Sequence, residues 1–495
     1  MNGIVYLVGA GPGAPGLLTL RGAELIRRAE VLVYDYLAAP EILNLAPESC
    51  RRIYVGKMAG NHAKTQDEIN QILVDEAKAG RVVVRLKGGD PYIFGRGGEE
   101  AQELVQAGIV FEVVPGISST VGAAAYAGIP LTHRDFNSQV ALITGHEKPD
   151  KPESAHNWKA LAQMGTISMV MGVRNLDHVC RALIEAGKPA DTPAALIQWG
   201  TTTRQRALSG TLADLAAKAE AENMGPPSLF VAGGVVSLRE QLNWFESRPL
   251  FGKKILVTRS REQASRLSSA LAELGAEVWE RPTIAIQPTD DPMYFQTALK
   301  DLPTYQWLVL TSPNGANLFL KALLDNGQDA RALAGLKIAV VGPGTAEALK
   351  PFGLKADLMP EKQYVAESLL ETLKAAGVGG SKILLARAQE GRDILPRGLI
   401  EAGAELTDLA VYKTVKAVWP EPLPGQPDLV TFTSSSTAAG LAEIIPLEER
   451  KNYSAASIGP VTTKTAKELG FQVVIEAEKY TIDDLVMAVA HFLAK

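Results

Sequence analysis

The sequence predicts an α/β protein. Short apolar segments rich in Val and Ile recur along the chain, and each is followed by a glycine-rich turn and an amphipathic stretch with helical spacing. With 495 residues the chain is also longer than one ordinary domain. We therefore expect several compact α/β units. In the first half the predicted strands are 5–8, 31–34, 82–86, 140–144, 167–171 and 229–231.

The strand and helix pattern pauses at 243–252 (NWFESRPLFG). Pro249 and Gly252 lie there, just before a new predicted strand at 254–258. We expect a first domain at 1–246, a linker at 247–252 and a second domain at 253–495.

The second half repeats itself. KILVTR at 254–259 returns as KILLAR at 382–387, and AVVGPGTAEALKPFG at 339–353 returns as ASIGPVTTKTAKELG at 456–470. Two further pairs recur in the same order, 308–316 with 430–438 and 364–373 with 480–489. The repeat predicts two similar lobes, 253–286 plus 416–495 and 287–415. Clefts between such lobes bind small molecules.

Composition excludes several classes of partner. A formal net charge of −5 gives no broad basic field, so we expect no nucleic-acid partner. Cys50 and Cys180 are far apart without a CxxC, and the six histidines are scattered, so neither a disulfide framework nor a metal site is expected. The N-terminus lacks a signal peptide and no apolar segment approaches the roughly 20 residues of a membrane span, so we expect a cytoplasmic protein.

Three glycine-rich loops follow predicted strands in the first half, at 9–16, 88–98 and 115–128. Glycines allow backbone N–H groups to approach a ligand. A dinucleotide-binding loop is the obvious alternative, but Pro12 and Pro15 interrupt its glycine fingerprint, and the strand at 31–34 leads directly into Asp35 without a suitable ribose-binding acid. We expect the three loops to converge on one ligand.

Residues 3–246 resemble the uroporphyrinogen III C-methyltransferases, also called precorrin-2 synthases. The shared motifs include GAGPG, VYDYL, VGK, RLKGGDPYIFGRGGEE, VVPGIS and AGIPLTHR. The resemblance implies the tetrapyrrole-methylase fold of two α/β lobes with S-adenosylmethionine between them, S-adenosylhomocysteine as product, and a homodimer formed through this half. The cofactor-binding positions that it implies are Pro12, Gly88, Gly89, Asp90, Ile93, Ser118, Ser119, Met171 and Gly200.

The substrate implied by this resemblance is uroporphyrinogen III, whose eight carboxylates surround four pyrroles. Its methylation at C2 and C7 gives precorrin-2, a precursor of sirohaem, cobalamin and some haem. Arg96 and Arg134 match motif positions and could bind carboxylates bidentately; the alternative is a salt bridge to Glu99 or Glu100.

Pyrrole methylation also requires that the resulting cation be relieved by loss of a proton. Asp35 and Lys57 match the family's proposed acid and base, and Glu99 is a competing base candidate. The alternative role for Asp35 is to cap the helix that follows it.

One motif departs from the family. Its opening loop normally reads GPGDP, whereas this chain reads GPGAP, with Ala14 at the position of the carboxylate. Alanine can neither accept hydrogen bonds from pyrrole N–H groups nor take a proton. The hypothesis is that methylation is weakened while the cofactor still binds.

Residues 253–495 resemble the uroporphyrinogen III synthases through ILVTR, LTSPNGA, VVGPGTAEAL, LLARA, LAVYKT, FTSSS and SIGPVTTKTAKELG. The resemblance implies a two-lobed fold that cyclises hydroxymethylbilane, with inversion of ring D and loss of water, without a cofactor. Tyr412 matches the family's candidate for the proton donor to the leaving hydroxyl. The alternative is an aromatic residue that closes a strand.

Hydroxyl groups at strand ends and in loops before helices of this half could bind substrate carboxylates, although each could equally cap a helix. Arg259 and Arg387 end matching strands and contact either substrate or an acid. The hydroxyl candidates are Ser312, Thr345, Ser434, Ser435 and Thr462, together with Ser436 and Thr463.

Three functions remain open. The first is a bifunctional enzyme that makes uroporphyrinogen III and methylates it. The second is a methylase of a later corrin intermediate, which the complete GGDPYIFGRGGEE motif disfavours. The third is a tetrapyrrole-binding protein with an inactive methylase half and an active synthase, favoured only by Ala14.

Overall fold

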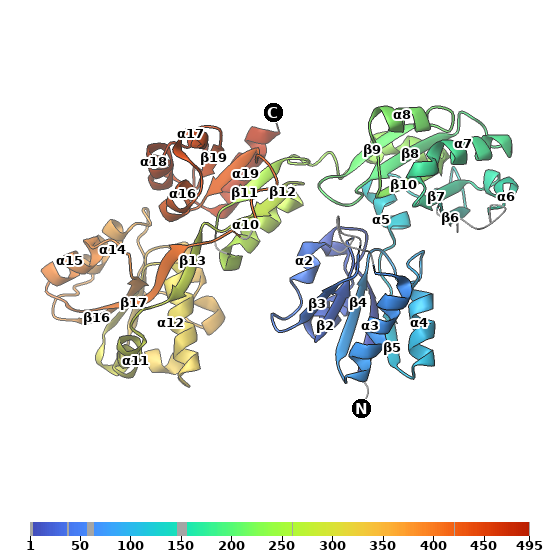
Figure 1. Ribbon diagram of the computed structural model, residues 1–495. Coiled ribbons are helices and arrows are strands. Elements are labelled where there is room, and N and C mark those ends of the chain that lie inside the picture. The colour runs from blue at the N-terminus through green and yellow to red at the C-terminus, as the bar shows by residue number, and fades with distance from the viewer. Residues whose placement is uncertain are drawn as a thin grey trace. The chain divides into compact units, whose positions relative to one another are not determined.

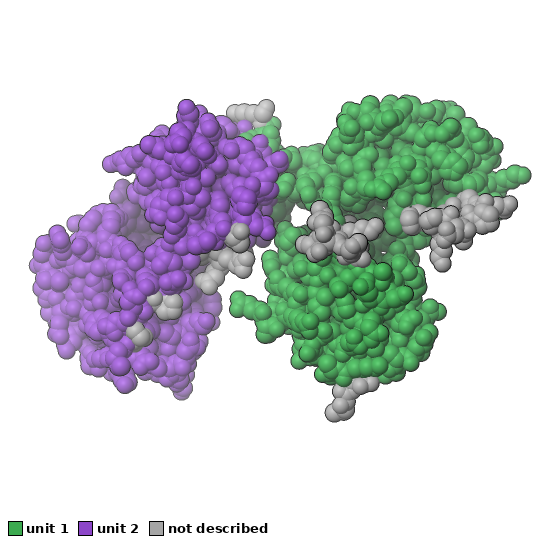
Figure 2. All heavy atoms as spheres, in the orientation of Figure 1, with its two compact units in different colours: residues 1–253, 271–277, 493–495 green, residues 254–270, 278–492 purple. Residues whose placement is uncertain are grey.

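The computed structural model describes residues 3–36, 39–56, 64–145, 156–259, 261–419 and 421–494. The chain folds into two compact units, coloured separately in Figure 2. The first unit comprises residues 1–253, 271–277 and 493–495, and the second comprises 254–270 and 278–492. Four five-stranded sheets form their frameworks, and Figure 1 labels many of the strands.

The first sheet is entirely parallel and has the order β3-β2-β4-β1-β5. Its side chains alternate between two faces, as the strand period of two requires. Val5 and Val83 pack beneath helices α3 and α4, whereas Val8 and Val84 pack against α1 and α2. The bounds are β1 (Ile4–Gly9), β2 (Val31–Tyr34), β3 (Arg51–Tyr54), β4 (Val82–Lys87), β5 (Val110–Val114), α1 (Leu20–Arg27), α2 (Pro40–Leu43), α3 (Gln66–Lys78) and α4 (Gly97–Gln106).

The second sheet is mixed and has the order β6-β7-β10-β8-β9. Met169 and Phe230 pack against α7 and α8 on one face, and Val231 packs against α5 on the other. Helix α5 therefore follows the last strand of the first sheet but packs on the second. The bounds are α5 (Ser119–Tyr126), β6 (Val140–Thr144), α6 (Trp158–Ala162), β7 (Thr166–Val170), α7 (Leu176–Glu185), β8 (Pro193–Gln198), β9 (Arg206–Thr211), α8 (Leu215–Ala221), β10 (Ser228–Gly233) and α9 (Arg239–Leu242).

The second half contains the other two sheets. Their orders are β12-β11-β18-β19-β20 and β13-β17-β16-β14-β15. The strand bounds are β11 (Lys254–Val257), β12 (Glu277–Glu280), β13 (Ile284–Pro288), β14 (Trp307–Leu310), β15 (Lys337–Val340), β16 (Lys382–Ala388), β17 (Glu405–Lys416), β18 (Leu429–Phe432), β19 (Ser454–Ser457) and β20 (Gln472–Glu476).

Helices cover these sheets, and short 3-10 turns join elements throughout the chain. The helices are α10 (Arg261–Glu273), α11 (Pro292–Lys300), α12 (Pro313–Asp325), α13 (Pro343–Glu347), α14 (Ala366–Ala375), α15 (Ile394–Glu401), α16 (Ser435–Ala442), α17 (Leu447–Arg450), α18 (Pro460–Glu468) and α19 (Ile482–Leu493). The 3-10 turns are η1 (Pro15–Leu17), η2 (Val173–Asn175), η3 (Gly234–Leu238), η4 (Leu302–Thr304), η5 (Ala330–Leu333) and η6 (Lys350–Phe352).

The repeated sequence segments occupy equivalent strands. KILVTR forms β11 and KILLAR forms β16, and the neighbours follow in the same order, β11-β18-β19 in one sheet and β16-β14-β15 in the other. Two lobes of one design therefore make up this half. One boundary differs from the expected lobes, because Ile284 lies opposite Lys416 in the antiparallel pair β13–β17. The strand at 284–288 thus belongs to the lobe expected at 287–415, called the middle lobe below. Its partner β17 is distant in the chain, so the local sequence gives no signal of this pairing.

The segment expected as a linker is packed. Leu250 is fully buried, and its backbone N–H donates to the carbonyl oxygen of Leu274 at 2.9 Å. The Phe245 and Phe251 rings lie 5.4 Å apart between centroids. Over the residues that the structure describes, no helix is both long and apolar enough to span a bilayer.

Candidate active sites

The three glycine-rich loops meet at the carboxyl ends of β1, β4 and β5. Gly11 and Gly89 exchange two backbone hydrogen bonds, of 3.1 and 2.7 Å between nitrogen and oxygen. A Cβ atom on Gly9 would lie 2.6 Å from the Cα of Gly116, and one on Gly116 would lie 2.3 Å from the carbonyl oxygen of Gly89. Side chains are excluded by backbone here, so this approach of the loops requires glycine.

Asp90 joins two of these loops. One carboxylate oxygen accepts the backbone N–H groups of Tyr92, at 2.8 Å, and Ile93, at 3.1 Å. The other accepts the N–H of Gly116 at 3.0 Å. Only 9% of Asp90 is exposed. The residue therefore shapes the loop after β4, and its expected contact with a cofactor stays a prediction.

Helix α5 supports loops from both sheets. Ser118 occupies its N-cap and Ser119 its first turn. A Cβ atom on Gly122 would lie 2.7 Å from Cγ of Pro12, and one on Gly200 would lie 2.3 Å from Cβ of Ala123. The helix thus brings together Pro12, Gly200 and the two serines, which the sequence places far apart. Gly89 lies against the same helix end.

Ala14 contacts the loop after β8. Its backbone N–H donates to Oγ1 of Thr201 at 3.0 Å. Ala14 also occupies the N-cap of η1, where no side chain makes a capping hydrogen bond. The partner loop is strained, because Trp199 and Thr201 have φ angles of +51° and +70°. Met171, directly after β7, has a φ angle of +56°. Such conformations persist only where surrounding contacts hold them.

Exposed apolar side chains lie in these same loops. The exposed fractions are 40% for Ile93, 39% for Ile117 and 52% for Met171. Polar backbone next to exposed apolar side chains is the usual composition of a small-molecule site.

Asp35 lies at the end of β2, beside a buried charge cluster. Its Oδ2 is 3.4 Å from Nη2 of Arg85, whose Nε is 3.2 Å from Oε1 of Glu100. The same Glu100 oxygen lies 2.7 Å from Nζ of Lys87. Asp35 does not cap α2, which begins at Pro40 with a different residue at its N-cap. This corrects the capping alternative.

The cluster is almost inaccessible. Arg85 and Lys87 are each 4% exposed and Glu100 is fully buried. Burial and the charge of Arg85 lower the pKa of Lys87, an effect that Glu100 opposes. The second carboxylate oxygen of Glu100 has no hydrogen-bond partner in the part of the chain that the structure describes. Two buried cations thus share the buried carboxylate of Glu100, and Arg85 also pairs with Asp35.

Of the other methylation candidates, Lys57 lies outside the described residues. Arg96 pairs with Glu99, with Nε 2.9 Å from Oε1 and Nη2 2.5 Å from Oε2. This ion pair is the alternative interpretation of Arg96, and it raises the pKa of the guanidinium. Arg134 is exposed.

Tyr412 and Ser312 come together in the middle lobe. Tyr412 lies on β17 and Ser312 caps α12, where its hydroxyl accepts the N–H of Gly315 at 3.0 Å. The two side-chain oxygens are 3.1 Å apart. Burial raises the pKa of the Tyr412 hydroxyl, and the hydrogen bond from Ser312 partly offsets that rise. Tyr412 is 6% exposed.

The remaining hydroxyl candidates fall into three sets. Thr345 and Thr462 lie within α13 and α18 and are 1% and 6% exposed, and their expected contact with substrate stays a prediction. Ser434 caps α16 in a capping box, which is its alternative role. The others hydrogen-bond to hydroxyl groups nearby: Ser436 to Ser434, Ser435 to Thr465, and Thr463 to Ser457.

The two matching arginines of the repeat differ. Arg387 makes two hydrogen bonds of 2.7 Å to the carboxylate of Asp408, which is its acid-pairing alternative. Burial lowers the pKa of Arg259.

Comparisons with known proteins match the two halves of the chain to two different families. The family "Tetrapyrrole (Corrin/Porphyrin) Methylases" matches residues 4–216, and "Uroporphyrinogen-III synthase HemD" matches residues 265–487. "Porphyrin biosynthesis protein HemD" of Ruminiclostridium josui is 40% identical over 499 residues, with 98% of this chain and 97% of the relative covered. The chain belongs to the family of porphyrin-biosynthesis proteins that fuse a tetrapyrrole methylase to a uroporphyrinogen-III synthase.

Two further matches cover the methylase half alone. The "S-adenosyl-L-methionine-dependent uroporphyrinogen III methyltransferase" of Methanosarcina barkeri is 54% identical over 241 residues, 48% of this chain and 94% of the relative. The crystal structure of uroporphyrin-III C-methyl transferase from Thermus thermophilus with S-adenyl homocysteine is 36% identical and covers 48% of this chain and 100% of its own, with a TM-score of 0.42.

Sequence reasoning missed Arg85 and Lys87 of the methylase half. The signal was present, because two cations interrupt the apolar strand VVVRLK. Their neighbour Glu100 was considered only as a partner for the arginines of the substrate site.

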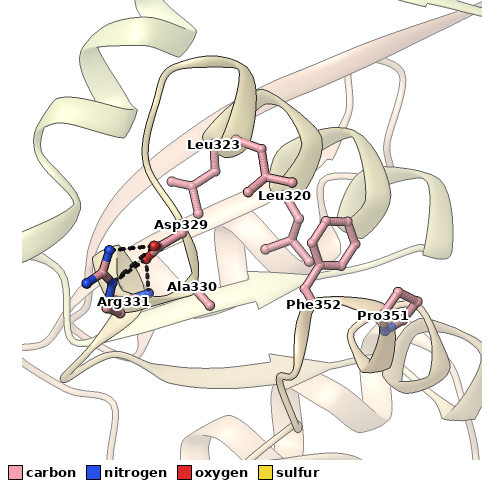
Figure 3. A pocket seen from close by; sticks show the side chains of 8 residues that line it. Leu320, Leu323, Asp329, Ala330, Arg331, Pro351 and Phe352 are labelled. Atoms are coloured by element: carbon pink, nitrogen blue, oxygen red, sulfur yellow. Dashed lines mark hydrogen bonds and ion pairs between the residues drawn. The ribbon is translucent and has the colours of Figure 1, made fainter.

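A separate pocket lies in the synthase half, with a volume of about 440 Å³. Leu320, Leu323 and Leu324 of α12 form one wall, Phe352 forms another, and the Asp329–Arg331 ion pair lies at its edge (Figure 3). None of the expected site residues lines this pocket.

Proposed function

We propose that the synthase half converts hydroxymethylbilane into uroporphyrinogen III and that the methylase half methylates this product at C2 and C7 to give precorrin-2. The convergence of three glycine loops with the N-terminus of α5 and the loop 199–202 is the observation that carries the methylation proposal. We propose a cytoplasmic homodimer, on the strength of the family resemblance.

The residues of the methylase site suit S-adenosylmethionine. Close backbone segments at Gly11 and Gly89 offer N–H and C=O groups, and Ile93 and Met171 offer apolar surface, which matches a ligand with both polar and apolar parts. When bound, this cofactor supplies an electrophilic methyl group. The residues proposed to hold it are Pro12, Gly88, Gly89, Asp90, Ile93, Ser118, Ser119, Met171 and Gly200.

Asp35 has the position of a proton acceptor for this reaction. The new C–C bond leaves a cation on the tetrapyrrole that is relieved by loss of a proton, and a carboxylate can take that proton. The Asp35 side chain is 27% exposed, and the guanidinium of Arg85 behind it fixes one of its oxygens. Lys57 and Glu99 remain the other candidates for proton transfer, and Arg96 and Arg134 for binding substrate carboxylates.

In the synthase half, Tyr412 acts as the proton donor. Its hydroxyl gives a proton to the departing hydroxyl group, which leaves as water. The electrophilic carbon then closes the ring with inversion of ring D, and the pyrrole carbon that forms the final bond loses a proton. The raised pKa of Tyr412 keeps that proton in place at neutral pH. Ser312 orients the phenol, and Ser434 and Ser435 are proposed carboxylate contacts. We propose that this step needs no cofactor.

Feeding hydroxymethylbilane to the full-length protein tests both activities. Uroporphyrinogen III without S-adenosylmethionine and precorrin-2 with it are expected. Uroporphyrinogen III under both conditions would instead support the second candidate, a methylase half that binds tetrapyrrole but is inactive. The observation that favours this second candidate is Ala14, which lacks the family's carboxylate and meets Thr201 only through its backbone.

A further inference from the structure

Trp199 of the methylase half has a cation on its ring. The Cζ atom of Arg204 lies 4.2 Å from the centroid of the indole. The ring of Tyr36 meets the same indole edge-on, with 6.0 Å between centroids and 66° between planes. Tyr36 is 61% exposed and directly follows Asp35, the proposed proton acceptor. The three side chains thus connect the end of β2 with the loop after β8.

The backbone fixes this loop in an unfavourable conformation. Trp199 and Thr201 are left-handed at φ angles of +51° and +70°. Oγ1 of Thr202 donates to the carbonyl oxygen of Trp199 at 2.7 Å, and the N–H of Thr201 donates to Oε1 of Gln205 at 2.8 Å. Gln205 is 3% exposed and donates in turn to Glu246 at 2.8 Å. A strained loop held this firmly is typical of a ligand site.

The guanidinium of Arg204 has no acidic partner among the described residues. Arg204 instead contacts the Trp199 ring and, through its backbone N–H, the hydroxyl of Thr202. Arg206, two positions further on, differs because its Nη2 lies 3.2 Å from a carboxylate oxygen of Glu222. Stacking uses the face of the guanidinium and leaves N–H donors at its edge, where a planar carboxylate can bind bidentately.

The position of Arg204 indicates what its guanidinium could bind. The loop that carries it also holds Gly200, a proposed cofactor contact, and Thr201, which binds the backbone of Ala14. We propose that Arg204, oriented by Trp199, binds one carboxylate of the tetrapyrrole substrate of the methylase half, and that the Tyr36 and Trp199 rings contact its pyrrole edge. This inference rests on the proposed methylation of a polycarboxylate tetrapyrrole. The competing explanation is a cation–π pair that only stabilises the loop.

Three variants of the full-length protein separate these explanations: Arg204→Ala, Arg204→Lys and the matched control Arg206→Ala. Uroporphyrin III, the stable oxidised octacarboxylate, is the binding probe, titrated by its own fluorescence. Loss of a charge-assisted contact predicts a Kd about tenfold to a hundredfold higher for Arg204→Ala. A smaller rise is expected for Arg204→Lys, which keeps the charge but not the planar fork, and no change for Arg206→Ala.

Turnover and cofactor affinity complete the test. In Arg204→Ala the KM for uroporphyrinogen III should rise by the same factor as the Kd, while kcat and the affinity for S-adenosylhomocysteine change less than about twofold. Equal binding by the wild type, Arg204→Ala and Arg206→Ala would overturn the proposal. A fall in Tm accompanied by loss of S-adenosylhomocysteine binding would also overturn it, in favour of a structural role. If the wild type binds uroporphyrin III but does not methylate uroporphyrinogen III, the proposed function fails while the titration still decides the role of Arg204.

Discussion

The hydroxyl oxygens of Tyr412 and Ser312 lie 3.1 Å apart, although 100 positions separate the two residues in the sequence. The serine hydroxyl also accepts the N–H of Gly315 at the start of α12. Ser312 therefore uses one lone pair of its hydroxyl oxygen on the helix. The hydroxyl can still donate its own proton to the phenol, or accept the proton of the phenol on its second lone pair. The orientation of Tyr412 depends on where α12 begins.

Replacement of Tyr412 with Phe should lower the rate of uroporphyrinogen III formation by about 10² or more, because the leaving hydroxyl loses its proton donor. Methylation of added uroporphyrinogen III should be unchanged. Chromatographic separation of the tetrapyrrole isomers measures the first effect. Tyr305→Phe is the matched control, since Tyr305 is 8% exposed in the same lobe and its hydroxyl donates to Thr407 at 3.0 Å. A comparable loss of cyclisation in both variants would contradict the role of Tyr412.

The raised pKa of Tyr412 also predicts how stability depends on pH. Below the ordinary tyrosine pKa, near 10, the phenol is neutral in the folded and unfolded chain. Above it the unfolded chain releases the proton first, so the free energy of unfolding should fall as pH rises through and above this value. Tyr412→Phe should weaken this alkaline dependence. Urea unfolding of both proteins between pH 8 and about 11 provides the comparison.

Substitution of Asp for Ala14 should raise methylation of uroporphyrinogen III with little change in S-adenosylhomocysteine affinity. A carboxylate there can also cap η1, which has no side-chain cap, and a cap of this kind contributes about 0.5–2 kcal/mol. Ala14→Asn separates the two effects, because asparagine caps equally well but takes up no proton. An equal rate in all three proteins would exclude a role for the family's carboxylate.

Glu100→Gln should destabilise the first unit by about 3–5 kcal/mol, since it removes the buried anion of Lys87 and leaves Arg85 with Asp35 alone. The pKa of Lys87 is already lowered, so the folded state binds fewer protons than the unfolded chain. Stability of the variant should therefore rise with pH. Urea unfolding at pH 7 and pH 9 measures both effects. The control is Glu103→Gln on the exposed side of α4, where less than about 0.5 kcal/mol is expected.

Both cysteines should resist thiol reagents in the native protein. Cys50 and Cys180 are 7% and 2% exposed, and burial raises the pKa of Cys180 to about 11. A thiolate is therefore scarce and inaccessible. Absorbance after addition of an aromatic disulfide should remain flat until urea unfolds the chain. Rapid reaction of the folded protein would show that one of these sites opens readily.

The sequence alone predicted the elements well where a local pattern carries them. Each expected strand of the first half overlaps an observed one, from 5–8 in β1 to 229–231 in β10. The return of KILVTR as KILLAR likewise predicted a pair of equivalent strands, which are β11 and β16. The glycine loops were also expected to converge, and they follow β1, β4 and β5, which pair in parallel in one sheet.

Long-range partners were less predictable. Asp90 matched a cofactor motif, yet its carboxylate binds three backbone N–H groups, one of them from another loop. Thr345 and Thr462 were expected at strand ends or in loops before helices, whereas both lie within the helices α13 and α18 and are buried. The contacts of Arg85 with Glu100 and of Arg204 with Trp199 depend on how distant segments fold together, which no local spacing encodes.

Helix α5 determines how this enzyme can be divided. It follows β5 in the chain, yet it packs against loops from both sheets of the first unit, at Pro12 and Gly200. A fragment that ends with the first sheet would retain GPGAP and GGDP. It would lose Gly200 and the helix α5 against which Pro12 packs. The methylase half should therefore be treated as one piece when chimaeras are designed. Its two sheets cannot be exchanged between relatives unless α5 and both loops that it supports are exchanged with them.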